Sequence, residues 1–118
     1  MHKPLAAASL LLVTLWAAAA HAHAFLDHAS PLVGGTVAAA PREVTLWFTQ
    51  SLEPAFSRAE VTDANGARVD QGNAQVSGST TRVGLKPLGA GTYRVRWHVL
   101  SVDTHTTQGS FTFHVGGR

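Results

Sequence analysis

Apolar and polar residues alternate along several short stretches of this chain, most clearly in residues 42–50, 91–103 and 109–115. Successive side chains of an extended strand point to opposite faces, so a period of two predicts a strand with one buried face. The residues predicted to share a buried face are Val44, Leu46 and Phe48, then Tyr93, Val95, Trp97 and Val99, and finally Phe111, Phe113 and Val115. His98 and His114 fall on the outward face, where we expect solvated residues.

Turn signals separate these stretches from weaker ones. Asn65-Gly66 lies between two short runs in residues 59–69, which predicts a hairpin. Pro87 ends another short strand that begins near residue 80. No segment has a helical period. Residues 52–56 could form a single turn, but Pro54 interrupts it. We therefore expect an all-β fold, with about seven antiparallel strands in a small sandwich or barrel.

The N-terminus follows a different pattern, that of an export signal. Lys3 gives a positive start, residues 5–20 are almost entirely apolar, and Ala20-His21-Ala22 is a small-x-small cleavage site. The apolar run is shorter than the roughly 17–25 residues that span a bilayer, which argues against an uncleaved membrane anchor. We interpret residues 1–22 as a cleaved secretory signal and residues 23–118 as one domain. Cleavage after Ala20 would also satisfy the small-x-small rule.

Composition limits the chemistry of the exported part. Without Lys3 it has eight lysine and arginine residues against seven aspartate and glutamate residues, so its net charge is near +1. It has no basic run, which argues against a nucleic-acid partner. The chain has no cysteine, and its one methionine is Met1. The mature protein therefore contains no sulfur, and thiol catalysis, disulfides and soft sulfur ligands are excluded.

Histidines are the remaining candidates for chemistry. Five follow residue 22, and each has an ordinary structural explanation: a chain terminus, an exposed loop, an outward strand position or a turn. They are His23, His28, His98, His105 and His114. Two features single out His23 and His105. Cleavage after Ala22 would make His23 the first residue, and Asp103 lies two positions before His105.

These residues together form a plausible metal-binding set. An N-terminal histidine offers its amine and its ring Nδ1, and the amine has a pKa of only about 7.7–8.0. If the strand that contains Tyr93 stays extended, Asp103 and His105 point to the same side. Such nitrogen and oxygen donors suit Cu(II) best and Ni(II) next, and zinc could use the same atoms.

Three stretches of the chain resemble the CopC family of periplasmic copper-resistance proteins. They are residues 23–37 (HAFLDHASPLVGGTV), 43–66 (EVTLWFTQSLEPAFSRAEVTDANG) and 91–115 (GTYRVRWHVLSVDTHTTQGSFTFHV). The most specific part of the resemblance runs from Tyr93 to Val115.

The resemblance implies a Greek-key β-barrel or sandwich of the cupredoxin or immunoglobulin-like type. It also implies one Cu(II), bound by His23 through amine and imidazole and by the Asp103–His105 pair. Cleavage would then fall after Ala22. The function implied is periplasmic copper sequestration, copper resistance or delivery of copper to a membrane importer, next to a membrane partner of the CopD type. We expect the protein to be a monomer.

The chain departs from some members of that family, which bind Cu(I) through a methionine-rich loop. Cu(I) prefers sulfur donors, and none is present after Met1. We therefore expect a single Cu(II) site and no sulfur-based Cu(I) site. A Cu(I) site built from histidines such as His28 is the remaining alternative.

Two other functions fit part of the pattern. A terminal histidine with a second imidazole also describes the copper brace of oxidative polysaccharide-cleaving enzymes. A chain this short leaves little room for a polysaccharide-binding face, and Asp103 would fill a position that oxygen activation needs open. A metal-free structural domain is the other alternative, because a β-sandwich by itself does not specify a function.

Overall fold

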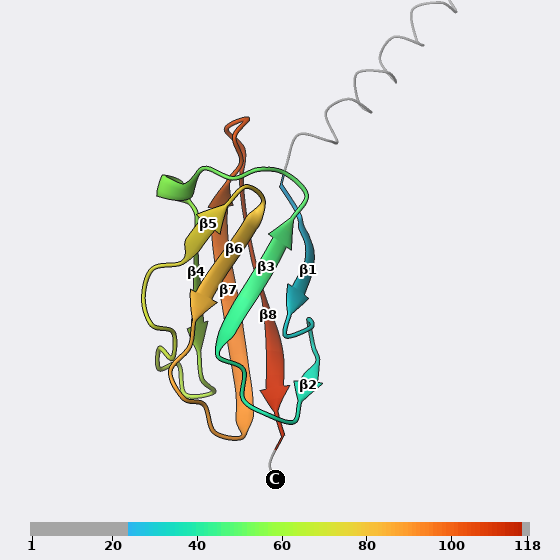
Figure 1. Cartoon of the computed structure of the whole chain (residues 1–118), viewed down its shortest axis with the longest axis vertical. Helices are drawn as coiled ribbons and strands as arrows, with labels where there is room; N and C mark the ends of the chain where they lie inside the picture. The colour runs from blue at the N-terminus through green and yellow to red at the C-terminus, as the bar shows by residue number, and fades with distance from the viewer. Residues whose placement is uncertain (1–23, 117–118) are drawn as a thin grey trace, which may run out of the picture.

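The structure, a computed structural model, describes residues 24–116 and shows two β-sheets packed face to face (Figure 1). One sheet has the strand order β1-β3-β6-β5, and the other has the order β2-β8-β7-β4. The strands are β1 (Leu26–Ser30), β2 (Thr36–Val37), β3 (Glu43–Phe48), β4 (Arg58–Thr62), β5 (Gln75–Ser77), β6 (Thr80–Gly84), β7 (Gly91–Leu100) and β8 (Thr106–Val115). The predicted all-β fold is confirmed as a β-sandwich.

The core lies between the sheets and uses the predicted apolar positions. Val44 and Leu46 of β3 belong to one buried cluster with Val95 and Val99 of β7, and these four side chains are fully buried, as is Phe113 of β8. Burial of each such side chain contributes roughly 1.5–3 kcal/mol to folding. The alternation in the sequence therefore marks the inner faces correctly.

Strands β7 and β8 form the longest hairpin of the domain. Their pairing runs without interruption from Gly91 opposite Val115 to Leu100 opposite Thr106. The hairpin extends along the whole sandwich, and the loop of residues 101–105 projects from one end of it (Figure 1). This loop carries both Asp103 and His105.

The predicted hairpin turn is present, and so is a helical turn that Pro54 was expected to interrupt. Gly66 has a φ of 88°, and its amide donates to the Asp63 carbonyl over 3.0 Å, so the hairpin turn lies at Asn65-Gly66. The single helical turn is a 3₁₀ turn, η2 (Pro54–Phe56). Pro54 occupies its start, where a missing amide proton costs no hydrogen bond.

Two details of the sheet differ from the expectation of about seven antiparallel strands. The structure describes eight strands, and the two-residue strand β2 pairs with β8 in parallel. A pair of residues is too short to show a period of two, so the sequence pattern does not reveal β2.

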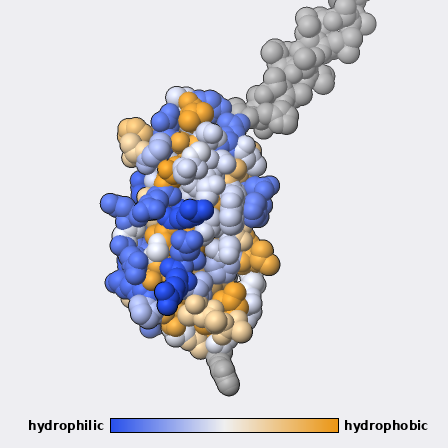
Figure 2. Space-filling model, viewed as in Figure 1, coloured by the Kyte–Doolittle hydropathy of each residue, from blue (hydrophilic) through white to orange (hydrophobic). Residues whose placement is uncertain are grey.

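The large exposed apolar side chains lie outside the strands. They are Phe25, Leu32, Val33, Phe56 and Val102. Figure 2 shows hydrophilic residues over much of the visible face, with apolar residues toward the two ends of the domain. Within residues 24–116 there is no helix with the length and apolar character that crossing a membrane requires.

Candidate metal centre

The loop that contains Asp103 and His105 is a tight turn held by its own backbone. The Ser101 amide donates to the His105 carbonyl over 2.9 Å, and the Thr104 amide donates to the Ser101 carbonyl over 2.9 Å. Thr104 has a φ of 74°, in the left-handed region that closes such turns. The two site residues are therefore fixed relative to each other by the turn.

This geometry corrects one step of the sequence argument. The pair was expected to share a face because β7 would continue as an extended strand. Strand β7 instead ends at Leu100, and the chain reverses between residues 101 and 105. The turn brings Asp103 and His105 together, so the expected proximity holds for a different physical reason.

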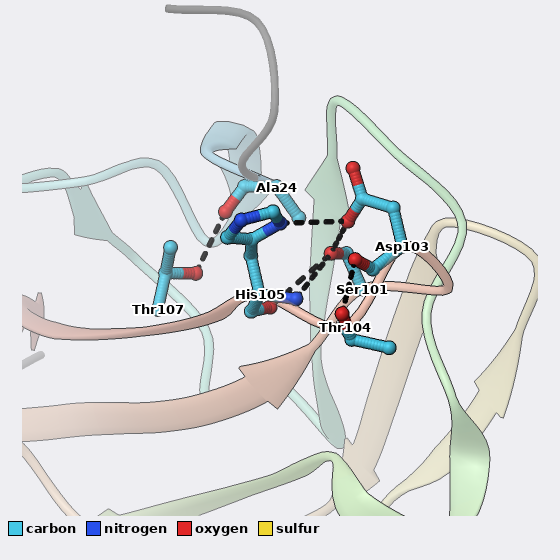
Figure 3. A network of polar contacts seen from close by, with 6 residues as sticks. All are labelled: Ala24, Ser101, Asp103, Thr104, His105 and Thr107. Atoms are coloured by element: carbon cyan, nitrogen blue, oxygen red, sulfur yellow. Dashed lines mark hydrogen bonds and ion pairs between the residues drawn. The ribbon is translucent and has the colours of Figure 1, made fainter. Parts of the chain in front are cut away.

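The two side chains are neighbours and accessible from solvent (Figure 3). His105 Nδ1 lies 3.4 Å from Asp103 Oδ1, and the side chains are 44% and 40% exposed. The Ser101 hydroxyl donates to the same carboxylate oxygen. An imidazole and a carboxylate are thus presented side by side at one end of the sandwich.

Asp103 is held in its charged form. The hydrogen bond from the Ser101 hydroxyl is the main reason that the pKa of Asp103 lies below its usual range, with partial desolvation opposing it and His105 adding to the lowering. The carboxylate is therefore ionised at neutral pH, which is the state that a metal ion requires.

The chain that follows His23 is anchored at this same end of the domain. The Thr107 hydroxyl, just after His105 in sequence, donates to the Ala24 carbonyl over 2.7 Å (Figure 3). The Phe25 amide donates to the Thr49 hydroxyl over 2.9 Å, and the Thr49 amide returns a bond to the Phe25 carbonyl. Ala24 is fully buried.

His23 itself and the proposed cleavage site lie outside the described residues. Within residues 24–116, no three histidine, cysteine, aspartate or glutamate side chains are close enough together to hold a metal ion. The structure therefore brings together two of the three predicted ligands, Asp103 and His105, and the metal-binding role of all three residues stays a prediction.

The other histidines occupy separate environments. His28 lies on β1 rather than in a loop, where it stacks on Trp47 with ring centroids 4.3 Å apart. His114 is half-buried and hydrogen-bonded to the Thr92 hydroxyl over 2.9 Å. His98 is also half-buried. The outward strand positions of His98 and His114 were predicted, but the two imidazole rings are less exposed to solvent than expected.

Sequence reasoning did not assign the roles of the two hydroxyl residues that organise the candidate site. Ser101 holds the turn and the carboxylate, and Thr107 ties the N-terminal segment to β8. Both lie within five residues of Asp103 in the sequence. Their roles depend on the turn and on a contact between segments 83 residues apart, which no local pattern reveals.

Comparisons with known proteins agree on one family. The model of the CopC domain matches residues 26–116. Protein YobA of Escherichia coli K12 is 36% identical over 111 residues, which cover 91% of this chain and 86% of that protein. Copper resistance protein C of Xanthomonas campestris pv. juglandis is 35% identical, with 90% of each chain covered. The crystal structure of PcoC, a methionine-rich copper resistance protein from Escherichia coli, superposes with a TM-score of 0.71 at 32% identity, covering 80% of this chain and 99% of PcoC.

Proposed function

The chain belongs to the CopC family of non-enzymatic copper-binding proteins of copper resistance, and from this premise we propose that it binds one Cu(II) in the periplasm. CopC proteins are typically periplasmic. The proposed role is to sequester copper there or to deliver it to a membrane partner of the CopD type. Copper is then the cargo of the protein.

The observation that carries this proposal is the Asp103–His105 pair. Two donor atoms that each lie about 2 Å from one metal ion are about 3 Å apart. The 3.4 Å between His105 Nδ1 and Asp103 Oδ1 is close to that separation. Small rotations of two partly exposed side chains suffice to direct both donors to one ion.

We assign the remaining donors to the amine and imidazole of His23. Removal of residues 1–22 would free that amine, which loses its proton far more readily than a lysine does. The bond from Thr107 to Ala24 supports this assignment, because Ala24 follows His23 directly and is held at the same end as His105. The resulting set of nitrogen and oxygen donors suits Cu(II).

Exchange of copper with a partner fits the exposure of the pair. Both side chains keep about two fifths of their surface in contact with solvent. A partner can therefore approach the ligands without unfolding the domain. A fully buried site would hold copper but would exchange it slowly.

Variants of the two described ligands test the proposal. In copper titrations against a competing chelator, we expect Asp103→Asn and His105→Ala each to weaken Cu(II) binding at least about tenfold, the effect of losing roughly 1.4 kcal/mol. His114→Ala is the matched control, because it removes a half-buried histidine at the far end of β8 from the loop. Unchanged affinity in both loop variants would contradict the proposed site.

A further inference from the structure

The outward face of the sheet β2-β8-β7-β4 carries polar side chains in two adjacent rows. Their neighbours along each strand, such as Ala59, Val95 and Phe111, are buried in the core, so these residues point away from it. Strand pairing places His98 opposite both Arg58 and Gln108, and Arg96 opposite both Glu60 and Ser110. The rows therefore run across β4, β7 and β8, and they are Arg58–His98–Gln108 and Glu60–Arg96–Ser110.

These two rows line an open depression of about 340 Å³ on the sheet surface. Its floor is the backbone around Ala59, Trp97 and Gly109, because the side chain of Trp97 turns inward and packs near Phe48 and Phe111. The depression thus combines a shallow backbone floor with polar walls.

The charge of the depression is positive. Arg58 and Arg96 are exposed, and neither forms an ion pair with any residue of the described chain. The one acidic lining residue, Glu60, is already engaged by Arg68 over 3.2 Å. Arg94, in the next row, donates to the Ser110 hydroxyl over 3.3 Å and adds a third guanidinium beside the depression.

His98 adds a ring N–H donor to this set. Its Nδ1 is buried and has no hydrogen-bond partner among the described residues. A proton on that nitrogen would be an unsatisfied buried donor, which costs more than an unused lone pair. The imidazole therefore carries its proton on Nε2, the nitrogen left for a ligand. The Gln108 amide and the Ser110 hydroxyl can also donate hydrogen bonds. The polar groups of the walls are therefore mostly hydrogen-bond donors.

We propose that this depression binds a phosphate group, either as free phosphate or as the headgroup of a phospholipid. A single arginine guanidinium can form hydrogen bonds to both oxygens of a carboxylate, which leaves none for a second arginine. A phosphate has enough oxygens to accept hydrogen bonds from two guanidinium groups and from further donors, so it fits this site better. Arg58 and Arg96 are diagonal neighbours on paired strands, a separation of about 7–8 Å that one tetrahedral anion can bridge through long side chains. The site lies on the sheet face and does not involve the copper ligands.

Titration of the purified protein with inorganic phosphate at low ionic strength tests the site. We expect the amide NMR signals of Arg58, Arg96, His98 and Ser110 to shift together with saturation. Arg58→Gln with Arg96→Gln should weaken binding at least about tenfold, given the strength of charge-assisted hydrogen bonds. Arg82→Gln is the matched control, because Arg82 is an exposed strand arginine on the opposite sheet.

A second arm separates the two sources of phosphate. The protein is sedimented with vesicles of phosphatidylglycerol and with vesicles of phosphatidylcholine, before and after the double substitution. Binding to either lipid that the substitution abolishes assigns the site to a headgroup, and phosphate binding without vesicle binding assigns it to the free anion. Absence of localised phosphate shifts would overturn the proposal. Equal weakening by Arg82→Gln would also overturn it, because both results indicate diffuse charge attraction.

Discussion

At the scale of single residues, Asp70 is the charged group most deeply built into the fold. Its side chain is only 2% exposed, and it accepts hydrogen bonds from two guanidinium nitrogens of Arg68 over 2.9 Å each. The Val61 amide of β4 also donates to it over 2.7 Å, and the Gly72 amide donates over 3.2 Å. Burial alone would raise the pKa of Asp70, but these donors outweigh it and lower the pKa.

We predict that Asp70→Asn destabilises the domain by about 2 kcal/mol at pH 7, the contribution of hydrogen bonds to a charged group. A lowered pKa in the folded state stabilises the fold above the unfolded pKa of about 3.9, and this stabilisation is lost as pH falls through the folded value. The difference in the free energy of unfolding between wild type and Asp70→Asn should therefore shrink below pH 4. Urea unfolding at pH 7 and pH 3 measures it.

The exposed Asp27, which pairs with His28 on the surface, provides the control for this prediction. Asp27→Asn should change stability little, because exposed ion pairs contribute little. A stability gap between wild type and Asp70→Asn that stays constant from pH 7 to pH 3 would contradict the role assigned to the Asp70 charge.

The residue scale also shows what sequence can predict of a site. Asp103 and His105 were identified from their spacing and from the family resemblance, and the structure brings them together. The roles of Ser101 and Thr107 were not assigned, because hydroxyl residues are common and their partners depend on the turn and on distant chain segments. Ligands carry a recognisable chemistry, whereas the residues that position them depend on the fold.

At the scale of elements, the β7–β8 hairpin depends on one close contact. Gly109 lies opposite Trp97, and a Cβ at residue 109 would lie 2.4 Å from Cζ2 of that indole. Trp97 packs in turn near Phe48 and Phe111. The ring therefore has little room to move away, and glycine is required by packing rather than by its φ angle.

Gly109→Ala should destabilise the domain by about 2 kcal/mol, the typical cost of forcing an extra methyl group into a packed core. Thermal and urea unfolding measure the loss. Gly89→Ala is the control, because an added Cβ there meets nothing within 4 Å. Equal stability of the two alanine variants would show that the Trp97 indole shifts freely, contrary to this account.

Strand length explains which elements the sequence predicted. The alternation in β3, β7 and β8 spans six to ten residues and marks their buried faces correctly. Strands β2 and β5 have two and three residues, too few to show a period. Their positions follow from pairing with β8 and β6, which is information about the assembled sheets.

At the scale of the whole molecule, residues 23–118 offer copper no sulfur donor. The one methionine of the sequence is Met1, and there is no cysteine. PcoC, which shares the fold, is by contrast a methionine-rich protein. A domain that offers copper only nitrogen and oxygen donors favours Cu(II) over Cu(I).

We therefore predict that the mature protein does not compete for Cu(I) with a chelator of nanomolar affinity, whereas it does compete for Cu(II). Anaerobic titration with a coloured Cu(I) chelator measures this. Tight Cu(I) binding would contradict the prediction, and its loss in His28→Ala would locate the responsible site at that histidine.

The most direct test of the central claim is a paired Cu(II) titration followed by electron paramagnetic resonance. One sample is the exported protein, with His23 confirmed as residue one by intact mass, and the other carries one extra glycine before His23. We predict one tight tetragonal Cu(II) in the first sample and loss of that spectrum in the second, because the extra residue removes the amine from His23. Identical spectra from the two proteins would contradict the proposed site, since copper would then bind without the terminal amine of His23.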